Sequence, residues 1–144
     1  MQNPPPVQTS SQPPAQTAKS STGLDENVAA LLSYIAGCIT GLVFFLIEKD
    51  SRLVRFHAMQ SLILSGGGFV IIIALWIFIV ISSLIIGQIS GILSFLVTMV
   101  LGLVVGVVGI AILIGAIIGL VKAYQGQYFK LPVIGNMAEK YSAK

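Results

Sequence analysis

Two uncharged apolar stretches dominate the chain, and one short charged segment separates them. Residues 28–47 hold no charge, and as a helix rising about 1.5 Å per residue they match the roughly 30 Å hydrocarbon core of a bilayer. Residues 58–121 are also uncharged and would extend about 96 Å as one helix, or about three bilayer thicknesses. The second stretch must therefore turn back within itself.

The strongest turn chemistry in the second stretch is Gly87-Gln88-Ile89-Ser90-Gly91, where two glycines bracket polar residues. We therefore expect a second span near residues 62–86, continuous with a polar start at Arg52, and a third near 92–121. The alternative is an additional turn in the glycine-rich region 102–109, which would give four spans.

The first stretch, residues 28–47, has two interpretations. Gly37 and Gly41 form a G-x-x-x-G pair, which lets a neighbouring helix approach closely within one continuous span. Gly37, Thr40 and Gly41 can instead mark a break that divides this span into two shorter pieces.

Charge placement discriminates between three and four spans. With three spans, seven basic residues share one side of the membrane: Lys49, Arg52, Arg55, Lys122, Lys130, Lys140 and Lys144. The other side holds only Lys19. The positive-inside rule then predicts the N-terminus outside and the C-terminus in the cytoplasm, whereas four spans would separate the two basic clusters.

Composition supports the membrane assignment. Of 144 residues, 56% are hydrophobic and 9% are charged, with a mean hydropathy of +0.95, whereas about a quarter of the residues in soluble proteins are charged. We predict an all-α, polytopic membrane helical bundle. The net charge of +3 lies near the membrane boundaries, which favours a bilayer with anionic headgroups as partner and argues against nucleic acid.

The two ends of the chain differ from its apolar middle. Residues 1–23 are rich in Pro, Gln, Ser and Thr, so we expect a disordered tail before a membrane domain over 24–144. At the other end, Pro132 can start a helix. A helix over about residues 132–141 would place Ile134, Met137 and Tyr141 on one face, which is typical of a short helix lying on the membrane surface.

Small residues recur every four positions through the third predicted span, first from Ser90 to Gly106 and then from Ala111 to Ala123. This pattern predicts close helix packing at Gly102, Gly106, Gly115 and Gly119. A pore-lining face is the alternative, but no ionisable residue accompanies the small residues to mark an ion path.

The sequence offers little catalytic chemistry. It contains no nucleophile motif, phosphate loop or dinucleotide fingerprint. His57 has no second histidine or cysteine at ligand spacing, so no metal site is expected, and the single cysteine, Cys38, excludes an intramolecular disulfide. We predict no catalytic residue, no cofactor and no enzymatic activity.

Polar residues at the start of the second helix suggest a structural cluster instead. Ser51 can cap a helix beginning near Arg52, and the spacing of His57, Gln60 and Ser61 then places them on one face. We predict a polar cluster that holds the second and third helices together at the inner boundary: Glu48, Arg52, Arg55, His57, Gln60, Lys122, Tyr124 and Gln125. Independent contacts with headgroups and water are the alternative.

Four segments carry a family resemblance: residues 32–35, 39–49, 54–61 and 123–132, of which the R-F-H-A-x-Q motif from Arg55 to Gln60 is the most specific. Over residues 24 to about 139, the chain resembles an uncharacterised prokaryotic family of Tic20-like small membrane proteins. That family is distantly similar to the chloroplast inner-envelope import channel subunit. The resemblance implies a helical bundle in a prokaryotic plasma membrane, with no established activity and no catalytic residues.

Two functions follow from these features. The first is a non-enzymatic membrane protein that acts through helix packing, as a scaffold, assembly or accessory subunit, with a second copy or another membrane protein as partner. The second is a small homo-oligomeric pore or transporter-like protein related to translocation. The import channel subunit is usually described with four spans, so a three-span chain weakens the transfer of its role.

Overall fold

The computed structural model describes residues 18–142, and the regular elements within them are helices with no β-strand, which confirms the all-α prediction. Most of the predicted tail, residues 1–17, lies outside the described residues. Seven helical elements follow in order: α1 (Glu26–Leu32), α2 (Cys38–Ile47), α3 (Arg52–Leu62), a π-helical turn η1 (Ile63–Gly67), α4 (Gly68–Gly87), α5 (Gly91–Tyr124) and α6 (Ile134–Ser142).

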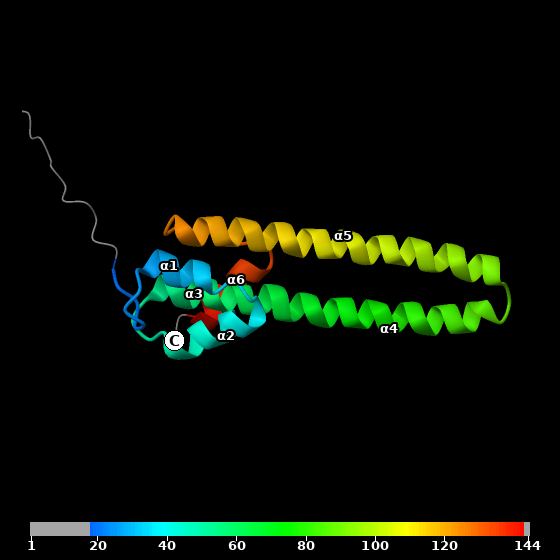
Figure 1. Cartoon of the computed structure of the whole chain (residues 1–144), viewed down its shortest axis with the longest axis horizontal. Coiled ribbons are helices and arrows are strands. Elements are labelled where there is room, and N and C mark those ends of the chain that lie inside the picture. Colours follow the sequence, from blue (N-terminus) through cyan, green and yellow to red (C-terminus); the bar gives the residue numbers. More distant parts are fainter. Residues whose placement is uncertain (1–17, 143–144) are drawn as a thin grey trace, which may run out of the picture.

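A long helical hairpin forms the frame of the molecule. α3, η1 and α4 join into one helix over Arg52–Gly87, and α5 returns beside it over Gly91–Tyr124 (Figure 1). Both helices are long and apolar enough to cross a membrane. The predicted turn between them is confirmed. α5 continues without a break through residues 102–109, so the additional turn of the four-span alternative does not form.

The first apolar stretch is two helices, so the prediction of one continuous span over residues 28–47 is wrong. α1 ends at Leu32 and α2 begins at Cys38. Gly37 has a φ of 56°, in the left-handed region that glycine adopts without strain. The Thr40 hydroxyl accepts from the Ala36 amide at 3.1 Å and donates to the Ser33 carbonyl at 3.0 Å. These groups stabilise a break into two shorter pieces, which was the alternative interpretation.

The segments that flank this stretch on either side meet. The backbone amide of Ser21 donates to the Glu48 carboxylate at 3.0 Å. A straight helix of twenty residues would separate its ends by about 30 Å. α1 and α2 therefore enter and return at the same end of the hairpin (Figure 1). The described part of the predicted tail, from Ala18 onward, takes part in this contact.

Gly37 and Gly41 allow α2 to lie close against the long helix. A Cβ at Gly41 would lie 2.9 Å from the Ala58 carbonyl oxygen and 3.0 Å from the Leu62 nitrogen. A Cβ at Gly37 would lie 3.0 Å from the Cβ of Ser65. The prediction that this glycine pair permits close helix approach is confirmed.

One end of the hairpin is covered and the other is not. α1, α2 and α6 surround α3 and the last turns of α5, and we call this end the head (Figure 1). Its apolar core joins α1, α3 and α5 through buried Ala29, Ala30, Tyr34, Leu53, Val54 and Ala123. Beyond the head, α4 and α5 pack on each other and expose many large apolar side chains. A helix that is apolar all round suits lipid as its solvent.

The predicted packing glycines divide between these two regions. A Cβ at Gly119 would lie 2.7 Å from the Tyr34 ring, and one at Gly115 would lie 3.5 Å from Leu64. Gly102 and Gly106 have no such neighbour within 4 Å among the described residues. The small residues Gly115 and Gly119 thus pack within the chain in the head, and packing at Gly102 and Gly106 stays a prediction.

The last helix occupies nearly the range expected from the sequence. α6 covers Ile134–Ser142, against a predicted 132–141, and it packs on α3 with Gly135 and Ala138 buried. Its placement on the membrane surface stays a prediction.

Candidate functional site

His57 and Gln60 form the centre of a buried polar cluster in the head. They lie three residues apart on α3, so they share a face of that helix, and both are fully buried. Tyr34, next to the break between α1 and α2, reaches them from one side. The segment between α5 and α6 reaches them from the other side through Gln127 and Leu131.

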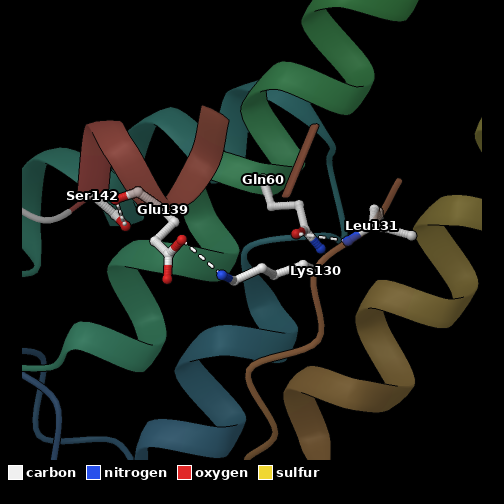
Figure 2. A network of polar contacts seen from close by, with 5 residues as sticks. All are labelled: Gln60, Lys130, Leu131, Glu139 and Ser142. Carbon is white, nitrogen blue, oxygen red and sulfur yellow. Dashed lines mark hydrogen bonds and ion pairs between the residues drawn. The ribbon is translucent and has the colours of Figure 1, made fainter. Parts of the chain in front are cut away.

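The hydrogen bonds of this cluster run in one direction. The Leu131 amide donates to Gln60 Oε1 at 3.4 Å (Figure 2), and Gln60 Nε2 donates to Tyr34 Oη at 3.0 Å. Tyr34 Oη lies 3.3 Å from His57 Nδ1, and His57 Nε2 lies 2.9 Å from the Gln127 carbonyl oxygen. A carbonyl only accepts, so Nε2 carries the hydrogen and Nδ1 of the neutral ring accepts from Tyr34.

Both ends of this chain of hydrogen bonds are backbone groups, so each polar side chain in it has a partner. Buried polar groups are costly unless they are hydrogen-bonded. The ring of His57 also meets the ring edges of Phe56 at 5.2 Å and of Tyr34 at 5.9 Å between centroids. The arrangement suits a rigid junction of α1, α3 and the segment after α5.

Glu48 forms a second buried polar contact at the start of α3. Its side chain accepts from the backbone amides of Ser51 at 2.9 Å and Asp50 at 3.0 Å, and from the Ser21 hydroxyl at 2.7 Å. Burial by itself raises the pKa of Glu48, but the bonds from Ser51, Ser21 and Asp50 together lower that pKa below its ordinary value. The ionised carboxylate thus ties the segment before α1 to the start of α3.

The eight residues predicted to form one polar cluster occupy separate places. His57 and Gln60 both contact the Tyr34 hydroxyl, whereas Glu48 belongs to the contact with Ser21. Arg52 is exposed, and the guanidinium of Arg55 lies 5.4 Å from the centroid of the Phe45 ring. The basic residues of α3 thus take no part in the buried chain of hydrogen bonds.

The predicted residues at the end of α5 lie at the surface. Lys122 Nζ lies 3.3 Å from Gln125 Oε1 and 3.0 Å from Gln127 Oε1, and it lies 5.8 Å from the centroid of the Phe129 ring. The Tyr124 side chain is exposed. Gln127 and Leu131, which sequence reasoning missed, are the residues after α5 that contact the buried cluster, and both do so through their backbone.

Sequence reasoning also missed Tyr34. A tyrosine inside an apolar stretch carries a hydroxyl that needs a partner when it is buried. That signal could have associated Tyr34 with His57 or Gln60. Within residues 18–142 there is no group of three or more His, Cys, Asp or Glu side chains placed to hold a metal ion.

Comparison with known proteins identifies the family. The sequence model of the magnetosome magnetite crystal formation protein family matches residues 23–138. The chain belongs to this family. The matched range includes the whole α1–α2 break, both long helices and most of α6.

Archaeal relatives of this family member are named as membrane proteins. A UPF0132 membrane protein of Methanocaldococcus jannaschii is 43% identical over 126 residues, covering 86% of this chain and 94% of the relative. A UPF0132 membrane protein of Archaeoglobus fulgidus is 39% identical over 117 residues, covering 81% and 95%. No solved structure matches the chain significantly. Together with the apolar helices, these relatives establish a membrane protein.

Proposed function

We propose that this family member is a non-enzymatic membrane protein that acts through helix packing, as a scaffold, assembly or accessory subunit. The observation that carries the proposal is the part of the hairpin beyond the head, where α4 and α5 have only each other as partners among the described residues. Gly102 and Gly106 on α5 have open space where a side chain would be. Small residues let a helix from another chain approach closely in lipid.

The proposed topology has two crossings, one by α4 and one by α5. All described basic residues belong to the head or its adjoining segments: Lys19, Lys49, Arg52, Arg55, Lys122, Lys130 and Lys140. The positive-inside rule then favours a cytoplasmic head, with the first and last described residues, Ala18 and Ser142, on that side of a prokaryotic cell membrane. The contact between Ser21 and Glu48 supports this topology over an N-terminus outside.

The family description concerns magnetite crystal formation, and the relatives are named only as membrane proteins. From these names we carry over to this chain only that its helix contacts form in a membrane. The distant similarity to the chloroplast import channel subunit stays a prediction, as does the alternative of a small homo-oligomeric pore.

Substitution of the open glycines tests the proposal. We expect the purified chain in mild detergent to associate with a second copy or a co-purifying membrane protein, and Gly102→Ile with Gly106→Ile to abolish that association. Val107→Ile is the matched control, because Val107 is an exposed apolar residue of the same helix. The helix content and unfolding temperature of all variants should stay close to those of the parent chain.

Two outcomes would overturn the helix-packing role. One is association that is unchanged by the glycine variants. The other is solute flux through liposomes that hold the purified chain and no partner, which would favour the pore instead.

A further inference from the structure

A cavity of about 430 Å³ opens in the head, where the start of α3 faces the segment before α6 and α6 itself. Its size falls in the range typical of small-molecule sites. It is lined by Arg52, Phe56, Tyr128, Lys130, Glu139 and Ser142. None of Tyr34, His57 and Gln60 lines this cavity, so it is separate from their buried cluster.

Cations outnumber carboxylates in the lining of this cavity. Lys130 Nζ pairs with Glu139 Oε2 at 2.7 Å (Figure 2). Arg52 has no ion pair among the described residues. The pair between Lys130 and Glu139 is about half exposed, and such pairs contribute little to stability, so an incoming anion can compete with Glu139 for the ammonium group. A guanidinium binds phosphate oxygens through two parallel hydrogen bonds.

An aromatic wall faces these charges. Phe56 is buried, and its ring centroid lies 5.6 Å from that of Tyr128. Burial and the Glu26 carboxylate raise the pKa of Tyr128, and the Arg52 guanidinium opposes them. The Tyr128 hydroxyl therefore stays protonated at neutral pH and can donate a hydrogen bond to an anion.

The cavity also lies at the charged end of the apolar hairpin. Arg52 and Arg55 are the last basic residues before a run without Lys, Arg, Asp or Glu that ends at Lys122. Tyr124 and Tyr128 follow Lys122, and tyrosine side chains are enriched at headgroup level. An anion that enters from the membrane surface would meet this cavity at that depth.

We propose that this cavity binds a phosphate ester of the kind that membrane lipids carry in their headgroups. Arg52 and Lys130 contact the phosphate oxygens, and Phe56 and Tyr128 contact the adjoining apolar part of the ligand. The site does not depend on the helix-packing role proposed above.

Binding of phosphatidylglycerol to the purified full chain, measured by native mass spectrometry and by titration of a fluorescent phosphatidylglycerol in detergent micelles, tests the site. We expect Arg52→Gln and Lys130→Gln each to weaken binding by roughly tenfold, as for the loss of a hydrogen bond to a charged group. Glu139→Gln should strengthen binding, because it removes the carboxylate that competes for Lys130.

Lys122→Gln is the matched control, because it removes one positive charge near the same boundary from outside the cavity. It should change affinity by less than about twofold, as for an exposed surface charge. Competition by glycerol 3-phosphate would identify soluble phosphate esters as ligands of the same site, and its failure to compete would identify the lipid. The site is refuted if Lys122→Gln weakens binding as much as Arg52→Gln, or if Glu139→Gln fails to strengthen it.

Discussion

The Nε2 atom of His57 lies 2.9 Å from the carbonyl oxygen of Gln127, although the two residues are 70 positions apart in the sequence. This contact connects the first turns of the long helix to the segment that follows α5. The same imidazole contacts Tyr34 on the opposite side of the ring. One side chain thus joins three parts of the chain that have no local sequence relationship.

Removal of this side chain should destabilise the head. We expect His57→Ala and Gln60→Ala each to lower the free energy of unfolding by about 2–4 kcal/mol, because each leaves buried partners unpaired and opens a cavity. The two losses should not add, because both side chains contact the Tyr34 hydroxyl. Thermal unfolding in detergent measures both effects.

Gln125→Ala is the control for these variants, since Gln125 is exposed and contacts Lys122 at the surface. It should change stability by less than about 0.5 kcal/mol. An unchanged unfolding temperature in the double variant of His57 and Gln60 would contradict a structural role for the buried cluster.

Gly41 should tolerate no side chain. A methyl group there would lie 2.9 Å from the Ala58 carbonyl oxygen, so Gly41→Ala must push α2 away from α3. We expect a loss of about 1–3 kcal/mol in the free energy of unfolding. Gly106→Ala is the control, because open space surrounds that position and alanine favours a helix. Equal losses in both variants would exclude close packing as the cause.

Labelling of single cysteines should report both ends of the α1–α2 stretch on one side of the membrane. In a Cys38→Ala background, we expect Thr22→Cys and Asp50→Cys to react with an impermeant maleimide only after the cells are permeabilised. Gln88→Cys, in the turn between the long helices, should react in intact cells. Reaction of Thr22→Cys and Asp50→Cys from opposite sides would restore a third crossing.

Acid should weaken the contact at the start of α3. The pKa of Glu48 is lower in the folded chain than its ordinary value of about 4.3. Its contribution to stability is therefore complete above that ordinary value, and it is lost as the pH falls through the folded pKa. We expect Glu48→Gln to lower the unfolding temperature at neutral pH and to reduce its dependence on acid. Glu139→Gln, which alters an exposed ion pair, should leave both unchanged.

The sequence was sufficient for the features that depend on local pattern. The length of the uncharged stretch and the two glycines around Gln88 predicted the hairpin and its turn. The spacing of Gly37 and Gly41 predicted close helix approach, because two small residues one turn apart open the same face of a helix to a neighbour. His57 and Gln60 were predicted to share a face for the same periodic reason.

The remaining features depend on contacts between distant segments. Twenty uncharged residues fit a straight span as well as a broken one, and the break is decided by bonds from Thr40 and by the fit of α2 against Ala58. The contact of Ser21 with Glu48 joins a polar tail to a charged turn without any local signal. Gln127 takes part through its backbone, which the identity of its side chain does not reveal.

The uncharged turn at residues 88–90 has a consequence for how the protein enters the membrane. No Lys, Arg, Asp or Glu lies between Arg55 and Lys122, and only these three residues separate α4 from α5. In the two-crossing topology, biosynthetic insertion of this hairpin carries no formal charge through the hydrocarbon, where each charge costs at least about 2.5 kcal/mol. The hairpin can therefore enter from the side on which it was synthesised. The head can then fold around the end of the hairpin that lies opposite the turn.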